Sequence, residues 1–214
     1  MNIQQLNTNN DLPIVHLEFF PSIKEIILFE ELRNVSIDIY ENFPKQTFRN
    51  RAVVMSSQGL LNIIVPTKNN GLKKTLMKDI EISYSERWNV EAWRTIFSCY
   101  GKSPFFIYYE DKVREILFKQ YKYLIDLNLE TFFFLQKAMN LQSSLNITSH
   151  YIDRIENNYR DMLLPKNRVA DGADLMPYYQ CFETKFEFQT NLSSLDLLFN
   201  LGNEANDYIR NAIR

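Results

Sequence analysis

Seven consecutive residues, 45–51 (KQTFRNR), combine three permanent cations with amide and hydroxyl side chains between apolar, strand-like segments. If this segment is extended, its alternate side chains point to one face, because strand side chains alternate with a period of two. Arginine offers a planar fork of donors that matches phosphate or carboxylate, so this face could bind an anionic ligand. The residues predicted to bind it are Lys45, Gln46, Arg49, Asn50 and Arg51. The alternative is a charged edge strand without a ligand, since Lys and Arg discourage pairing between sheet edges.

Polar residues of the preceding predicted strand are close to this segment in sequence. Asp38 and Tyr40 share the polar face of that strand, and Glu41 follows directly. Such groups could act as acid or base, or could orient the arginines as counter-charges. We therefore predict Asp38, Tyr40 and Glu41 as the catalytic residues. The alternative is a salt-bridge network that serves the fold alone.

The residue types that commonly hold metals and cofactors are scarce in this chain. His16 and His150 are its only histidines and are far apart in sequence, so we predict no metal site. Cys99 and Cys181 are its only cysteines, and neither has a basic neighbour in sequence that would activate the thiol. With five glycines, the chain has no glycine-rich phosphate loop, and we predict no cofactor.

Length and composition limit the protein to a few classes. The 214 residues, 45% of them hydrophobic, suit one domain, which we predict to span residues 13–214 after a poorly ordered N-terminus of residues 1–12. The net charge of −2 argues against nucleic-acid binding. No apolar run approaches the ~20 residues needed to span a bilayer, and the N-terminus lacks the features of a secretory signal. We therefore expect a cytoplasmic protein without a membrane span.

Hydrophobic periodicity and turn residues predict an α/β fold, with a mixed β-sheet, flanking helices and a helix-rich second half. The predicted strands are residues 14–20, 35–39, 48–55, 60–65, 80–84 and 145–151. The predicted helices are residues 22–29, 89–100, 103–121, 129–141, 193–201 and 204–213. Residues 60–65 are apolar on both faces, which is typical of a central strand. Residues 14–39 form the strand–helix–strand unit of a parallel sheet.

Several motifs together resemble the WbqC-like family of bacterial proteins. The matching segments are residues 19–23 (FFPSI), 41–51 (ENFPKQTFRNR), 64–66 (IVP), 93–96 (WRTI), 100–106 (YGKSPFF) and 191–200 (NLSSLDLLFN). They follow one another in a fixed order and cover most of the chain from Phe19 onwards. Each segment alone is a weak signal, whereas the ordered series is fairly specific.

The resemblance implies a role in bacterial surface-polysaccharide pathways, of which O-antigen synthesis is one, or in a specialised-metabolite pathway. The resemblance does not fix the reaction, and the first hypothesis is an enzyme, a transferase, whose ligand would be a sugar nucleotide or an acyl-carrier thioester. Both ligands carry phosphate, which the cationic segment would bind. The second hypothesis is a divergent, non-catalytic subunit that binds a partner protein of the same pathway.

The chain departs from the family pattern at positions where chemistry is expected. Relatives tend to carry histidine where Tyr40, Ala92 and Phe186 stand here, and often cysteine where Ala52 follows the cationic segment. Tyrosine does not act as a base at neutral pH as imidazole does, and alanine and phenylalanine have no titratable group. If those histidines are catalytic in relatives, this chain has lost that chemistry, which favours the non-catalytic hypothesis.

Overall fold

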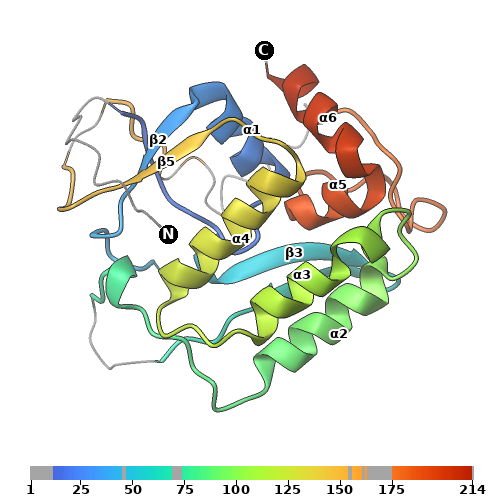
Figure 1. The fold of residues 1–214 in the computed structure, drawn as a ribbon, viewed down its shortest axis with the longest axis horizontal. Coiled ribbons are helices and arrows are strands. Elements are labelled where there is room, and N and C mark those ends of the chain that lie inside the picture. Colours follow the sequence, from blue (N-terminus) through green and yellow to red (C-terminus); the bar gives the residue numbers. More distant parts are fainter. Residues whose placement is uncertain are drawn as a thin grey trace.

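The strands of the protein form two separate sheets (Figure 1). The structure is a computed structural model that describes residues 12–44, 47–68, 74–153, 156–160, 162 and 175–213. Strands β1 (Ile14–Val15), β2 (Asn34–Ile37) and β5 (Ser144–Ile147) form a parallel sheet in the order β1–β2–β5. Strands β3 (Arg51–Ser56) and β4 (Gly59–Ile64) form an antiparallel pair. The predicted α/β class, with parallel and antiparallel strands, is confirmed. Residues 1–11 of the predicted poorly ordered N-terminus lie outside the described residues.

Helices are concentrated in the second half of the chain, as predicted. The α-helices are α1 (Ile23–Leu32), α2 (Trp88–Tyr100), α3 (Phe106–Phe118), α4 (Leu124–Ala138), α5 (Ser194–Leu201) and α6 (Ala205–Ala212). The short 3-10 helices are η1 (Phe48–Asn50), η2 (Met77–Asp79) and η4 (Gly202–Glu204). Within the described residues, no helix has both the length and the apolar character needed to cross a membrane.

The unit formed by β1, α1 and β2 agrees with the predicted strand–helix–strand pattern. Ser22 caps α1, and its hydroxyl accepts a hydrogen bond from the backbone N–H of Glu25 over 3.3 Å. Strands β1 and β2 are parallel, with Val15 opposite Ile37. The predicted return of the chain to the sheet near residue 145 is also confirmed, because β5 pairs in parallel with β2.

The first predicted strand, residues 14–20, is wrong beyond Val15. Residues 16–20 are buried but irregular, and two of their backbone groups bond to side chains of α4. The Asn128 amide donates to the Leu17 carbonyl over 2.9 Å, and the Phe20 N–H donates to the Thr131 hydroxyl over 3.3 Å. Buried backbone groups need such partners, so α4 replaces the strand neighbour that this segment lacks.

Two further strand predictions need correction. Strand β4 is not central, since among the described residues it pairs only with β3, and Leu60, Leu61 and Ile64 are 54%, 41% and 49% exposed. Residues 80–84, predicted as a strand, make only isolated bridges, with Thr67 and Tyr123 as partners. The predicted hairpin is confirmed by the pairing of β3 with β4. Gly59 supplies the positive φ of 109° that its turn requires.

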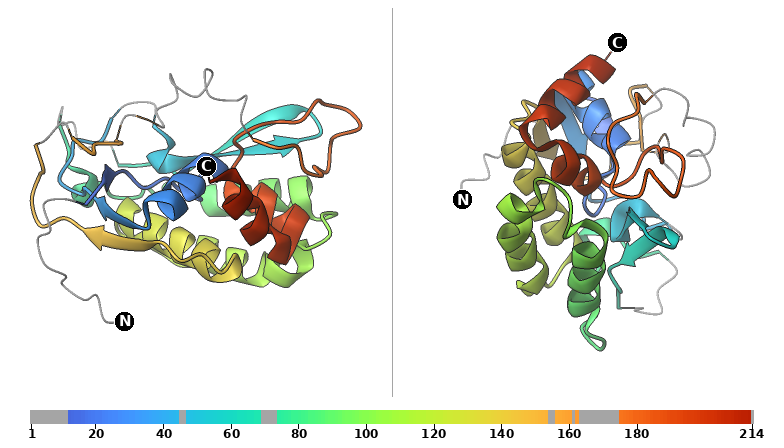
Figure 2. Two further views of the ribbon diagram at one scale, coloured as in Figure 1. Left: turned by 90° about the horizontal axis from the view of Figure 1, so that it is seen from above. Right: turned by 90° about the vertical axis from the view of Figure 1, so that its right-hand side faces the viewer.

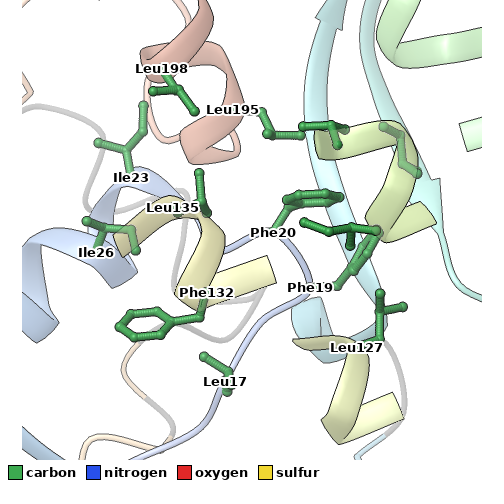
Figure 3. Packing of buried hydrophobic residues seen from close by; sticks show 14 of the residues in the cluster. Leu17, Phe19, Phe20, Ile23, Ile26, Leu127, Phe132, Leu135, Leu195 and Leu198 are labelled. Atoms are coloured by element: carbon green, nitrogen blue, oxygen red, sulfur yellow. The ribbon is translucent and has the colours of Figure 1, made fainter. Parts of the chain in front are cut away.

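The core lies between α1, α4, α5 and the irregular segment 16–20 (Figure 3). Its labelled residues in Figure 3 are Leu17, Phe19, Phe20, Ile23, Ile26, Leu127, Phe132, Leu135, Leu195 and Leu198. Helix α1 also contacts α6, so the first and last helices lie side by side (Figures 1 and 2). Helix α2 packs against both strands of the hairpin. Segments from both ends of the chain therefore fix the position of the parallel sheet.

Candidate functional site

Each strand of the parallel sheet ends at a polar residue. His16 follows β1, Asp38 follows β2, and Thr148 follows β5. The Asp38 N–H donates to the Val15 carbonyl over 3.4 Å. The Thr148 N–H donates to the Ile37 carbonyl over 3.1 Å, so these residues stay in register at one edge. Open α/β sheets bind ligands at the carboxyl edge of their parallel strands, which makes this edge the candidate site.

Asp38, a predicted catalytic residue, is fully buried in an ion pair with Arg160. Its Oδ2 accepts from Arg160 Nη2 over 2.5 Å and from the Ile152 N–H over 3.4 Å. Its Oδ1 accepts from the Tyr40 N–H over 2.9 Å and from Thr148 Oγ1 over 3.2 Å. A carboxylate accepts about four hydrogen bonds in all, so this group has little capacity left for a substrate. The geometry is that of the salt-bridge alternative.

Glu41, also predicted as catalytic, forms a second buried ion pair with Arg49. Arg49 Nε donates to Glu41 Oε1 over 2.8 Å, and Arg49 Nη2 lies 2.7 Å from the same oxygen as its ion-pair partner. The remaining Nη1 donates to Thr47 Oγ1 over 2.9 Å. Arg49 is 2% exposed and Glu41 is 8% exposed. The guanidinium that was predicted to bind an anionic ligand therefore binds a carboxylate of the same chain.

The predicted extended conformation of residues 45–51 is wrong at residues 48–50, whereas Thr47 and Arg51 are extended. Residues 48–50 form η1, and Thr47 caps it by accepting a hydrogen bond from the Arg49 N–H over 3.1 Å. A helical turn breaks the period-two alternation, so Arg49 and Arg51 do not share an extended face. Lys45 and Gln46 lie outside the described residues.

The other predicted residues differ in how many of their polar groups already have partners within the protein. Asn50 donates from its side-chain amide to the Val65 carbonyl over 3.0 Å, which is a structural contact. Tyr40 is half-buried, with the Lys78 ammonium 5.3 Å from its ring centroid. Arg51 is half-buried, its Nε is buried without a hydrogen bond, and its guanidinium has no ion-pair partner among the described residues. Of the predicted cations that the structure describes, Arg51 is thus the one whose charge is not neutralised.

Sequence reasoning missed a polar cluster beside Asp38. The side chains of His16, Glu18 and Glu25 are all at least 97% buried, and one ligand atom from each lies within 4.8 Å of the others. His16 Nδ1 lies 2.8 Å from the Arg160 carbonyl, which connects this cluster to the Asp38 ion pair. The available signal was the presence of His16 and Glu18 inside an apolar run, because ionisable groups in such a run need partners.

A second buried polar cluster lies around Asp196 on α5. The carboxylate of Asp196 is 1% exposed and accepts from the Tyr178 hydroxyl over 2.5 Å and the Gln180 amide over 3.3 Å. Burial raises the pKa of Asp196 from 3.8 to about 6, although hydrogen bonds from Tyr178 and Tyr100 oppose this rise. Perturbed carboxylates occur at functional sites and in structural networks alike, and here four polar side chains enclose the group.

We expect the Asp196→Asn variant to lose a pH dependence of stability that the wild type has. Because the pKa is raised in the folded state, Asp196 contributes most stability below pH 3.8 and loses it as pH rises through about 6. The difference of roughly two pH units corresponds to about 3 kcal/mol. The wild type should therefore gain up to about 3 kcal/mol relative to Asp196→Asn between about pH 7 and pH 4, measured by urea unfolding. A difference between the two proteins that stays constant with pH would contradict this assignment.

Neither thiol has the environment of a nucleophile. Burial raises the pKa of Cys99 to about 11 and also raises the pKa of Cys181. Cys181 Sγ lies 2.9 Å from Ser103 Oγ, a neutral partner that does not generate a thiolate. This agrees with the interpretation of both cysteines from the sequence.

Two surface hollows lie elsewhere on the described part of the chain. One, of about 400 Å³, lies between the end of α4 and α6, and Arg210 is among its lining residues. The other, of about 380 Å³, is lined by Lys68, Lys122, Tyr84 and their neighbours. Both lysines already interact with Glu81, at 2.7 and 3.8 Å. None of the predicted catalytic or binding residues lines either hollow.

Comparison with known proteins gives one match. Residues 29–176 match the model of the WbqC-like protein family, which is well over half of the 214-residue chain. No curated protein matches the chain, and no solved structure matches it. The matched range includes Asp38, Glu41, Arg49, Arg51 and Arg160, whereas His16, Glu18 and Glu25 precede it.

Proposed function

The chain belongs to the WbqC-like protein family, and from this premise we propose that it binds a phosphate- or carboxylate-bearing small molecule at Arg51. The ligand class is a sugar nucleotide or an acyl-carrier thioester of a bacterial surface-glycan or specialised-metabolite pathway. In its enzymatic form the proposed activity is that of a transferase.

The state of Arg51 is the observation that carries this proposal. Burying part of a guanidinium is unfavourable unless its N–H groups find acceptors. Arg49 and Arg160 have carboxylate partners, whereas Arg51 has none among the described residues. The buried Nε of Arg51 also has no hydrogen-bond acceptor, a feature that it shares with the Nε of Arg160. A phosphate or carboxylate would supply both the missing acceptor and the missing charge.

The two buried ion pairs set a limit on catalysis. Asp38 and Glu41 are each held by a guanidinium, so a proton-transfer role for either requires opening a buried pair. Tyr40 is more accessible, but its side chain faces the cation of Lys78. The proposal is therefore stronger for ligand binding than for chemistry.

A second candidate function, binding of a partner protein, is favoured by strand β4. This strand is paired on one side only and exposes Leu60, Leu61 and Ile64. Exposed apolar side chains on a strand with an unpaired edge are a common docking surface for another polypeptide. The non-catalytic hypothesis would use this surface.

Thermal unfolding with panels of sugar nucleotides and acyl-CoA compounds tests the ligand proposal. A ligand at about 100 times its Kd adds about 2.7 kcal/mol to the stability of the native state, which raises the Tm of a domain of this size by roughly 5–10 °C. We expect such a shift for the wild type and for Arg51→Lys, and its loss in Arg51→Gln, which keeps much of the side-chain length but not the charge.

The Lys122→Ala variant is the matched control, because it removes a cation from the surface hollow and leaves Arg51 in place. A ligand-induced rise in Tm that persists in Arg51→Gln but is lost in Lys122→Ala would show that the ligand binds in the hollow, and it would overturn the Arg51 assignment. The absence of a shift with any compound, together with a partner protein that co-purifies only when β4 is unchanged, would favour the second function.

A further inference from the structure

We propose that His16, Glu18 and Glu25 form a binding site for a divalent transition-metal ion. Their ligand atoms are one imidazole nitrogen and two carboxylate oxygens, all within 4.8 Å of one another. The three side chains are 3%, 2% and 0% exposed, so the site lies inside the protein beside the carboxyl edge of the parallel sheet. All three residues precede residue 29, where the family match begins, and the inference is independent of the proposed function.

The fold brings the two glutamates together at the start of α1. In a common helix start, the glutamate at the third helical position accepts from the backbone N–H of the capping residue. Here Glu18 Oε2 accepts the Ser22 N–H instead, over 2.9 Å. Glu25 turns to the Glu18 N–H, at 3.2 Å from each of its carboxylate oxygens. This exchange of partners directs the Glu25 carboxylate towards residues 16–18.

The orientation of His16 is the second observation. Its Nδ1 lies 2.8 Å from the Arg160 carbonyl, so Nδ1 carries the hydrogen and donates it. Metal-binding histidines characteristically donate one ring N–H to a carbonyl or carboxylate and bind the metal through the other nitrogen. The other nitrogen, Nε2, makes no hydrogen bond among the described residues and lies 3.6 Å from Glu18 Oε1. A metal ion bound to both atoms at about 2.0–2.2 Å would fit this separation, because two ligands of one tetrahedral ion are about 3.3–3.6 Å apart.

Distances and donor types decide which metal fits. Zinc binds nitrogen and carboxylate oxygen at about 2.0–2.2 Å in a tetrahedral arrangement, so the ligand atoms of one ion are about 3.3–3.6 Å apart. The ligand atoms of the cluster lie within 4.8 Å of one another, so the most distant of them must move towards the ion when it binds. Imidazole suits zinc and iron, and carboxylates suit manganese and magnesium, so the mixed set matches Zn²⁺ and Mn²⁺ best. Mg²⁺, which prefers oxygen ligands and retains its waters, fits least well.

Metal analysis and thermal unfolding of the whole chain test this site. Protein stripped with EDTA is dialysed against Zn²⁺, Mn²⁺ or Mg²⁺, and the bound metal is quantified by plasma mass spectrometry. We expect about one equivalent of Zn²⁺ or Mn²⁺ and a higher Tm, because a metal that binds only the folded state stabilises it. The Mn²⁺ experiment separates this site from the two cysteine thiols, which favour zinc over manganese.

The variants separate a metal site from a protonated ion pair. In His16→Asn the side-chain amide still donates to the Arg160 carbonyl, but Nε2 is gone. Its affinity should fall by more than about 100-fold, because loss of an outer-shell partner alone costs about 10–100-fold. His150→Asn, which changes the exposed second histidine, should bind as the wild type does. If His16→Asn folds poorly, Glu25→Gln gives the same test while keeping an acceptor for the Glu18 N–H. Wild-type protein without bound metal, or full binding by either variant, would overturn the proposal.

Discussion

Replacing Asp38 with alanine is expected to lower the free energy of unfolding by about 3–5 kcal/mol, the range for removing one partner of a buried ion pair. Asp38 is fully buried, and its two oxygens accept four hydrogen bonds from Tyr40, Thr148, Ile152 and Arg160. Alanine would leave the Arg160 guanidinium buried without its counter-charge. The effect is large because an unpaired buried charge costs more than the pair contributes.

Loss of Asp38 should also have a local effect. Three of its four donors belong to residues 148–160, which the carboxylate ties to the end of β2. In the Asp38→Ala variant, amide hydrogens of the described residues 148–153 and 156–160 should exchange faster than those of α4 and α5. Urea unfolding measures the global change, and native-state hydrogen exchange measures the local one.

Asp153→Ala is the matched control for this prediction. It removes a carboxylate from the segment that Asp38 ties to β2, but Asp153 is exposed, so its loss should leave stability nearly unchanged. If Asp38→Ala proved as stable as this control while ligand-dependent activity disappeared, Asp38 would be a catalytic residue and the ion pair would be incidental.

The elements that sequence predicted well are those with local causes. Ser22 and Ser193 accept hydrogen bonds from N–H groups two or three residues later, and both helices begin where these caps indicate. Gly59 provides a backbone conformation that a tight turn needs, and the hairpin forms around it. In each case the residues that determine the structure are neighbours in sequence, so no knowledge of the rest of the chain is required.

The predictions that failed concern segments whose structure depends on residues far away in sequence. Residues 16–20 resemble a strand, but the hydrogen-bond partners of Leu17 and Phe20 are on α4, 111 residues away in sequence. Strand β4 is apolar on both faces, which normally indicates a central strand, yet it ends at the sheet edge because no further strand pairs with it among the described residues. A pattern of apolar residues indicates that a segment is extended; it does not say which surface covers it.

In the candidate site, too, features with local causes could be predicted and features with distant causes could not. Asp38, Glu41 and Arg49 were predicted as site residues because charges beside apolar strands must be paired or functional, and the structure places each of them in a buried ion pair. Their partners were not predictable: Arg160 is 122 residues from Asp38, and Arg49 could have paired with either nearby carboxylate. His16, Glu18 and Glu25 were missed because a cluster built from a strand end, a loop and a helix start has no fixed sequence spacing.

The buried pair of Glu41 and Arg49 yields the second large prediction, and a double-mutant cycle tests it. Glu41→Leu leaves the Arg49 guanidinium buried and unpaired, and Arg49→Met leaves the Glu41 carboxylate buried and unpaired. Each single variant should therefore be destabilised by about 3–5 kcal/mol. The double variant, with neither charge, should recover to within about 1–2 kcal/mol of the wild type, since apolar replacements of both partners are often neutral. Urea unfolding of the four proteins measures the coupling. Glu115→Leu, which breaks the exposed pair with Lys112, should change stability little because solvent screens that pair.

The same cycle decides what Arg49 is for. If its role is to neutralise Glu41, the double variant will be stable and will keep the ligand-induced rise in Tm, because Arg51 still binds the anion. If Arg49 contacts the ligand directly, the double variant will be stable but insensitive to ligand, and Glu41→Leu will be rescued by ligand, whose charge replaces the lost carboxylate. The observed geometry favours the first outcome, since Arg49 already donates to Glu41 through Nε and to Thr47 through Nη1, its Nη2 is in the ion pair with Glu41, and the side chain is 2% exposed. A ligand would have to displace a carboxylate held at 2.7 Å to reach it, whereas Arg51 offers its donors without that competition.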